Sequence, residues 1–216
     1  MPKSKRFYFF LIFFLLAGLI AGLFTAKVLE QGVPDLDQAS KGFAKALAGT
    51  LIFEIFRWLT ELGSSTFLTV IVVLGGTYLW IKKHDPLAAL MLTTGVLASY
   101  GVNYVIKQLI ARERPRILEA ADGDGFSFPS GHAMVSMVAY GLLVYFFIYY
   151  STSIKRSILI TASGAVLIAL IGLSRYIIRV HYLTDILAGF SFGFLFLMIW
   201  ILIYYQIDAH VSRSPD

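Results

Sequence analysis

Residues 182–205 read YLTDILAGFSFGFLFLMIWILIYY, an apolar run in which Asp185 is the only charged residue. About 20 apolar residues in an α-helix cross the hydrocarbon core of a bilayer. Five similar runs precede this one, at roughly residues 7–28, 65–81, 87–106, 132–150 and 157–173. The run 182–205 therefore predicts the last of six transmembrane helices.

The composition agrees with a membrane protein. Hydrophobic residues make up 58% of the 216 residues and charged residues 14%, whereas a soluble domain is about half apolar and about a quarter charged. No repeat interrupts the chain, so we expect one all-α domain over residues 1–216. The absence of cysteine excludes thiolate metal sites, cysteine nucleophiles and disulfides. The net charge of +5 comes without a dense basic cluster, so we expect no nucleic-acid partner.

Basic residues in the short connections predict the topology. Three groups fall on one side of a six-helix arrangement, namely Lys3, Lys5 and Arg6, then Lys82 and Lys83, then Lys155 and Arg156. The positive-inside rule makes that side cytoplasmic. The first apolar run is longer than the 7–15-residue core of a signal peptide, so we expect it to be retained. Both termini are then cytoplasmic, and the opposite end of the bundle faces outward.

The connection between the first two spans, residues 30–63, carries a helical pattern. Phe43, Leu47, Leu51, Ile55 and Leu59 recur at every fourth position, and the charged residues fall mostly elsewhere on the wheel. This pattern predicts an amphipathic helix. Such a helix either lies in the membrane interface or packs on the bundle.

Three polar clusters break the apolar pattern, and six spans place all of them at the same face of the membrane. The clusters are Lys107-x6-Arg114-Pro115, Pro129-Ser130-Gly131-His132 and Ser174-Arg175-x5-His181-x3-Asp185. A single cation at a helix end commonly extends its charge to the headgroups. Three cations beside two histidines and one aspartate instead indicate an anion site, and phosphate suits the forked guanidinium of arginine.

The second and third clusters also suggest chemistry. Pro129-Ser130-Gly131-His132 has the form of a helix opening, where free backbone N–H groups bind anions, although an ordinary helix start has the same form. His181 and Asp185 are four residues apart, which places them on one face if they share a helix. A carboxylate on one imidazole nitrogen leaves the other free as a nucleophile, although a purely structural pair would look the same. His132 can supply a proton to the departing oxygen.

A metal site is the chemical alternative. His84 lies in a basic loop and His210 in the polar tail, so only His132, His181 and Asp185 remain as ligands. Three ligands can hold zinc, but the adjacent lysine and arginines would repel a cation. We therefore expect neither a metal nor another cofactor.

These residues resemble the three-part signature of the type 2 phosphatidic acid phosphatase family. The match covers residues 107–185 and fills every fixed position at the usual spacing, and the six-span layout resembles the bacterial membrane branch. The resemblance implies that His181 attacks phosphorus, Asp185 orients it and His132 protonates the leaving group, without metal. It implies that the phosphoryl oxygens are held by Lys107, Arg114, Ser130, Gly131 and Arg175. Arg112, Arg116 and Arg179 lie outside the signature, and we expect them to contact a second phosphate or a headgroup.

The expected substrate is a lipid phosphate that reaches the site through the bilayer. Small bacterial members of the family are similar to phosphatidylglycerophosphate phosphatases, our first choice, and to undecaprenyl pyrophosphate phosphatases or broad lipid phosphate phosphatases. A lipid or ion transporter is the main alternative outside enzymes, but its polar groups belong at the midplane. An inactive lipid sensor is a further alternative, which the complete signature argues against. The sequence implies no oligomeric state.

Overall fold

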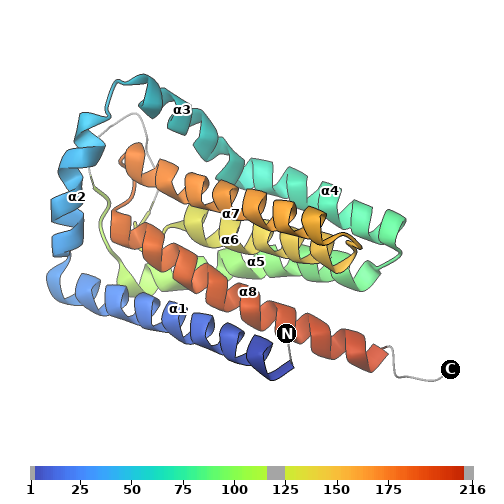
Figure 1. The fold of residues 1–216 in the computed structure, drawn as a ribbon. Helices are drawn as coiled ribbons and strands as arrows, with labels where there is room; N and C mark the ends of the chain where they lie inside the picture. The colour runs from blue at the N-terminus through green and yellow to red at the C-terminus, as the bar shows by residue number, and fades with distance from the viewer. Residues whose placement is uncertain (1–2, 116–124, 212–216) are drawn as a thin grey trace.

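The computed structural model describes residues 3–115 and 125–211, and the regular secondary structure within these ranges is all helical (Figure 1). In chain order, the elements are α1 Lys3–Gln31, α2 Asp35–Ala46, α3 Leu51–Leu59, the 3₁₀ turn η1 Thr60–Gly63, α4 Ser65–Lys83, α5 Pro86–Ile110, α6 Gly131–Tyr149, α7 Ile154–Ile177 and α8 Leu183–Val211.

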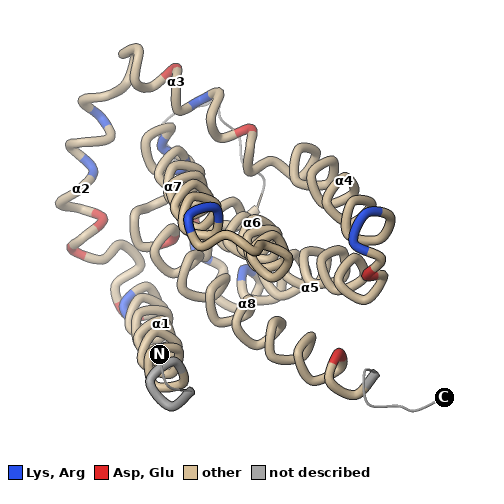
Figure 2. Tube along the Cα trace, turned by 45° about the vertical axis from the view of Figure 1, so that its right-hand side comes forward, with Lys and Arg blue, Asp and Glu red and all other residues tan. Residues whose placement is uncertain are grey.

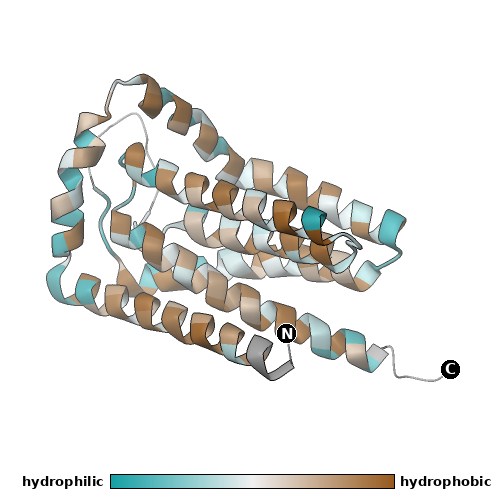
Figure 3. Cartoon of the chain, viewed as in Figure 1, coloured by the Kyte–Doolittle hydropathy of each residue, from teal (hydrophilic) through white to brown (hydrophobic). Residues whose placement is uncertain are grey.

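Six of these helices, α1, α4, α5, α6, α7 and α8, are long and apolar enough to cross a membrane. They run alongside one another, with hydrophobic residues along most of their length and hydrophilic residues toward the two ends (Figure 3). Figure 2 likewise shows the charged residues at the ends of the long helices and along α2 and α3. The prediction of an all-α, multi-pass bundle of six spans is confirmed.

Helix α6 lies at the centre of the bundle. It packs against α5, α7 and α8, and Val135, Val138, Leu142 and Phe146 on it are buried in the main hydrophobic core. By contrast, α1 packs mainly on α8 and leaves most of its apolar surface exposed. The start of α6 is therefore held on several sides, which suits a helix that carries a site residue.

Capping residues fix where the spans begin and end. The side chains of Ser64, Asp85 and Ser153 accept hydrogen bonds from the first turns of α4, α5 and α7, as oxygen-bearing side chains do at helix starts. Helix α5 ends at Ile110, and the residue that caps it, Ala111, adopts a left-handed conformation with φ 51°. This turn sends the chain away from α5 toward Arg112 and Arg114.

The connection between the first two spans differs from the prediction of one amphipathic helix. It forms two helices, because Gly49 takes φ +75° after α2 and Thr50 caps the start of α3. The predicted four-residue repeat therefore does not follow a single helical axis. Figure 1 shows α2 lying across one end of the bundle and α3 leading back to α4. Within α2, Asp37 and Ala44 are buried, whereas α3 has no buried residue.

A glycine on α8, Gly189, allows α8 to approach α6 closely. A Cβ added at Gly189 would lie 2.8 Å from the Ser130 carbonyl oxygen and 3.0 Å from Ala133 Cβ. Only glycine permits this approach without displacement of the backbone. The first turn of α8 is thereby placed beside the first turn of α6, at the end covered by α2 and opposite the two chain termini (Figure 1).

Candidate active site

All eight predicted site residues lie in the described part of the chain, at the end of the bundle covered by α2. Lys107 is in the last turn of α5, Arg175 in the last turn of α7, and Asp185 in the first turn of α8. The remaining five are Arg114 after α5, Ser130, Gly131 and His132 at the start of α6, and His181 before α8. The three clusters therefore meet, as the six-span arrangement predicts.

His181 and Asp185 form the most buried pair of the site, with 3% and 0% of their surfaces exposed. His181 Nδ1 is 3.4 Å from Asp185 Oδ2. The two residues do not share a helix, because α8 begins at Leu183. They meet because Asp185 Oδ2 also accepts the Tyr182 backbone N–H, at 2.9 Å, and so folds the preceding loop onto the helix start.

The protonation of His181 follows from its surroundings. Burial is the largest effect and lowers the pKa of His181 well below its usual value, because it disfavours the charged imidazolium. The positive charges of Arg114, Arg175 and Lys107 lower this pKa further, and a hydrogen bond to the Ser127 backbone opposes them. The imidazole is therefore neutral at neutral pH. With its proton on Nδ1 facing Asp185, Nε2 carries a lone pair, which accepts an N–H from Arg114 NH1 at 3.2 Å.

The Pro-Ser-Gly-His segment opens α6, with its proline just before the helix. Ser130 is the N-cap and Gly131 the first helical residue, so Pro129 precedes the helix. The Ser130 side chain accepts from Ala133 N at 3.5 Å, and its backbone N–H donates to the Asp185 carbonyl oxygen at 3.0 Å. This second bond ties the start of α6 to α8. A Cβ at Gly131 would lie 3.1 Å from Asn103 Oδ1, so glycine fits a close contact with α5 as well.

The cations surround His181 and His132 from three elements. Lys107 Nζ donates to the Phe126 carbonyl oxygen, and Arg114 donates to the carbonyl oxygens of Gly125 and Val180, both at 3.0 Å. Arg175 donates to Thr60 Oγ1 at 3.0 Å, while its buried Nε has no hydrogen-bond partner in the described residues. A buried N–H of a guanidinium without an acceptor is unusual, and a phosphoryl oxygen would satisfy it.

His132 faces the same group of charges. It lies within electrostatic range of Arg175, His181, Arg114 and Lys107. The turn η1 covers it, because a Cβ at Gly63 would lie only 3.0 Å from His132 Cδ2. The two imidazoles are therefore at one end of the bundle and close to the same cations.

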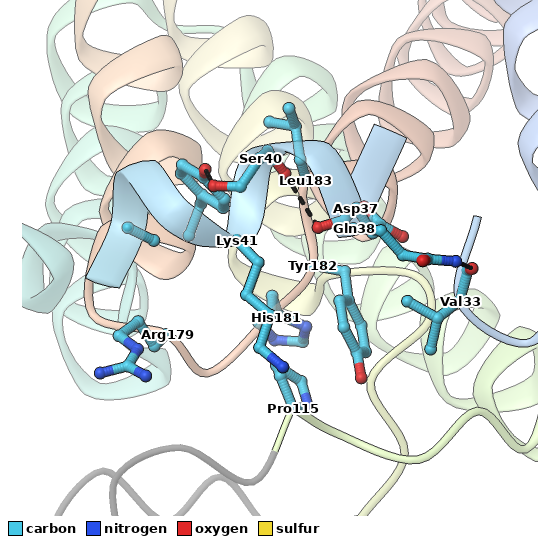
Figure 4. A pocket seen from close by; sticks show the side chains of 12 residues that line it. Val33, Asp37, Gln38, Ser40, Lys41, Pro115, Arg179, His181, Tyr182 and Leu183 are labelled. Carbon is cyan, nitrogen blue, oxygen red and sulfur yellow. Dashed lines mark hydrogen bonds between the residues drawn. The ribbon is translucent and has the colours of Figure 1, made fainter. Parts of the chain in front are cut away.

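A cavity of about 400 Å³ adjoins His181. It lies between α2 and the segment 176–183, and Figure 4 shows Lys41 extending from α2 toward Pro115 and His181. Arg179, with φ 64°, lines the same cavity. The cavity thus has apolar and polar walls, and its lining includes two cations, Lys41 and Arg179, as well as His181.

The three arginines outside the signature, which were expected to contact a second phosphate or a headgroup, differ in their surroundings. Arg179 lines the cavity, as a headgroup contact would require. Arg112 does not fit the expected contact with a second phosphate, because its side chain is 4% exposed and forms ion pairs with Asp37 and Asp185. Arg116 lies outside the described residues. Asp37 was not predicted as a site residue, because nothing in the sequence distinguishes it from the neighbouring Asp35.

The described residues contain no group of three His, Asp or Glu side chains arranged to hold a metal ion. His132 does not join His181 and Asp185 in such a group. The prediction of chemistry without metal stays a prediction.

Residues 87–209 match the PAP2 superfamily. The chain belongs to this family. A phosphatidylglycerophosphatase B of Bacillus subtilis is 32% identical over 86% of the chain and 88% of that protein. A Schizosaccharomyces pombe palmitoyl-protein thioesterase-dolichyl pyrophosphate phosphatase fusion is 26% identical, and the match spans only 27% of that longer protein.

One solved structure confirms the fold of this PAP2 protein. The crystal structure of a transmembrane PAP2-type phosphatidylglycerolphosphate phosphatase from Bacillus subtilis superposes with a TM-score of 0.79 at 26% identity, over 94% of this chain and 98% of that one. The family resemblance inferred from the three polar clusters is confirmed, and the chain is a lipid phosphatase of the phosphoric monoester hydrolase class.

Proposed function

We propose that this chain hydrolyses phosphatidylglycerophosphate to phosphatidylglycerol and inorganic phosphate, through a phosphohistidine on His181 and without metal. The observation that carries the proposal is the neutral, buried His181, with Asp185 on one imidazole nitrogen and Arg114 on the other. The name of the similar Bacillus subtilis protein and the description of the similar solved structure support the choice of substrate. We take residues 1–216 to act as one catalytic domain.

In the first step, the lone pair on His181 Nε2 attacks phosphorus and the ester P–O bond breaks. The N–H of Arg114 that now faces Nε2 turns to a phosphoryl oxygen as the substrate enters. The Nε–H of Arg175, which has no partner among the described residues, donates to a second phosphoryl oxygen, and Lys107 adds a point charge. Such charges stabilise the transition state of phosphoryl transfer because its negative charge spreads over the phosphoryl oxygens.

Proton movements complete the two steps. His132 donates a proton to the departing alkoxide, and then takes a proton from the water that attacks the phosphohistidine. The P–N bond breaks, its electron pair returns to Nε2, and inorganic phosphate leaves. A covalent intermediate of this kind replaces one difficult displacement by two easier ones.

The substrate reaches the site from the bilayer. The six spans keep the chain within the membrane, and the cavity beside His181 has Lys41 and Arg179 to attract an anionic headgroup. The basic connections lie at the opposite end of the bundle, together with the termini (Figure 1). By the positive-inside rule, we place the termini in the cytoplasm and the active site on the outer face of a bacterial cytoplasmic membrane.

A polyprenyl pyrophosphate is the second candidate substrate. The observation in its favour is the Schizosaccharomyces pombe relative, whose name includes a dolichyl pyrophosphate phosphatase. In that case, undecaprenyl pyrophosphate would be the bacterial equivalent, and a broad specificity for lipid phosphates would combine the two candidates.

Phosphate release from a panel of lipids in mixed micelles tests the proposal. The panel contains phosphatidylglycerophosphate, phosphatidate and undecaprenyl pyrophosphate, and the comparison uses kcat/KM. We expect the highest value for phosphatidylglycerophosphate, and no release above background by a folded His181→Asn variant. A higher kcat/KM for the polyprenyl pyrophosphate would reverse the choice of substrate, and full activity of His181→Asn would refute the nucleophile.

A further inference from the structure

Arg112 lies two residues after α5 and is not part of the signature. It is the centre of a buried polar network. Four of its five N–H groups donate to oxygen atoms on three segments. Nε donates to the Gly32 carbonyl oxygen at 3.0 Å, and NH2 to Asp37 Oδ2 at 2.7 Å. NH1 donates to Thr184 Oγ1 at 2.9 Å and to Asp185 Oδ1 at 2.5 Å. This guanidinium therefore uses most of its N–H groups in bonds within the protein and not for the substrate.

Asp37 joins α2 to the start of α8. Its Oδ1 accepts the Thr184 backbone N–H at 2.9 Å, and its Oδ2 accepts the Thr184 hydroxyl at 2.6 Å. Thr184 is the second residue of α8, and N–H groups in the first turn of a helix have no partner within it. Asp37 supplies that partner from another element. It thereby fixes the first turn of α8, which carries Asp185.

The two oxygen atoms of Asp185 have different partners. Oδ1 is bound by Arg112, whereas Oδ2 faces His181 Nδ1 and the Tyr182 N–H. The Tyr182 ring also covers the Arg112 guanidinium, whose carbon lies 4.0 Å from the ring centroid. With one oxygen held by Arg112, the carboxylate cannot rotate its other oxygen away from the imidazole.

The charges in the network affect whether Asp185 is ionised. Asp37 and Asp185 both have fully buried side chains, and Arg112 is the cation that bonds to both. Two carboxylates that share a buried site cannot both stay ionised without a compensating cation. Arg112 is therefore needed for Asp185 to carry the charge that holds the His181 proton on Nδ1.

We infer that Asp37 and Arg112 are positioning residues for the nucleophile: they keep Asp185 ionised and turned toward His181, and they couple α2 to the reaction centre. The inference rests on the proposed function of His181. It assigns no contact with the phosphoryl group to either residue. Because α2 also lines the cavity beside His181, the same contacts link the wall of that cavity to the orientation of the nucleophile.

The charge balance of the network distinguishes a positioning role from a purely structural one, because only a positioning role predicts that a second substitution restores activity. Arg112→Gln leaves two buried carboxylates without their shared cation. Arg112→Gln combined with Asp37→Asn removes one cation and one carboxylate, so Asp185 can again be ionised, with Lys107 as its nearby cation. Asp35→Asn is the matched control, because Asp35 lies in the same first turn of α2 but is exposed.

We expect folded Arg112→Gln to lower kcat for phosphatidylglycerophosphate about 100-fold, as misplaced catalytic groups do, with KM within about 3-fold of the wild type. The double variant should regain about 10-fold in kcat over Arg112→Gln. Asp35→Asn should match the wild type. Arg112→Lys keeps the charge but loses the planar fork, and it should fall between the wild type and Arg112→Gln.

Thermal unfolding in detergent identifies the variants that fold. If Arg112→Gln cannot be isolated folded, Asp37→Asn and Arg112→Lys carry the test, with kcat about 10-fold down at unchanged KM for each. Wild-type kcat in folded Arg112→Gln, or a double variant no better than Arg112→Gln, would overturn the inference and leave the proposed function intact. No turnover by the wild type would instead refute the proposed function.

Discussion

The close packing of α8 on α6 predicts a strong effect of Gly189→Ala. The new Cβ would lie 2.8 Å from the Ser130 carbonyl oxygen, whereas ordinary contacts begin at 3.4 Å. The atom in conflict belongs to the backbone, so a side-chain rotation cannot relieve it. The two helices must separate by about half an ångström or more, as overpacked cores do at a cost of roughly 1–3 kcal/mol.

A separation of α6 from α8 moves the site residues on the two helices apart. Ser130 and His132 move with α6, while Asp185 moves with α8 and, through its bond to Tyr182 N, holds the loop with His181. A misplacement of about 1 Å in an active site reduces the rate by about 100-fold. We therefore expect Gly189→Ala to lower kcat about 10- to 100-fold at a temperature where the variant remains folded.

The assay is phosphate release in mixed micelles, with thermal unfolding measured on the same preparation. Gly101→Ala on α5 is the control, because nothing lies within 4 Å of a Cβ at that position. It should retain wild-type kcat. Wild-type kcat in folded Gly189→Ala, or an equal loss in Gly101→Ala, would refute the reasoning about the α6–α8 contact.

Three further predictions concern metal, protonation and orientation. Treatment with EDTA should leave kcat unchanged, and a loss that a divalent ion restores would favour a metal site. Burial and the neighbouring cations lower the pKa of His181, so its imidazole should stay mainly neutral at pH 6. NMR measures this, and the His181 signal is the one that His181→Asn removes. Titration of that signal at or above pH 6.5 would contradict the lowered pKa. The chain has no cysteine, so Lys41→Cys and Lys82→Cys can report the topology. A thiol reagent that does not cross the membrane, added outside the cell, should label Lys41→Cys and not Lys82→Cys. Labelling of Lys82→Cys alone would reverse the proposed orientation.

The fold was accessible from the sequence because a bilayer imposes a length on each span. Apolar runs of that length stand out, and all six were predicted. The division of residues 30–63 was not, because the hydrophobic repeat continues across Gly49, and only the left-handed backbone there and the cap at Thr50 separate α2 from α3. A repeat in sequence does not report such a turn.

The site was accessible to the extent that its residues occur in dense polar clusters. Lys107, Arg114, His132, Arg175 and His181 stand out against apolar spans, and the topology brings them together. The four-residue spacing of His181 and Asp185 suggested that the two side chains meet, but their contact depends on the loop before α8 and not on a shared helix.

Arg112 and Asp37 could not be placed from the sequence. They are 75 residues apart, and a buried ion pair between distant elements has no local signal. Arg112 resembled one more cation for the substrate, and only its burial and its four acceptors distinguish it from Arg114.

The central claim is that His181 carries the phosphoryl group between the two chemical steps. The most direct test is a single-turnover reaction with ³²P-labelled phosphatidylglycerophosphate, quenched in alkali within milliseconds, followed by peptide mapping. We expect acid-labile label on His181 that rises before inorganic phosphate appears and then decays. Label on another side chain, or phosphate release with no labelled protein at any quench time, would contradict it.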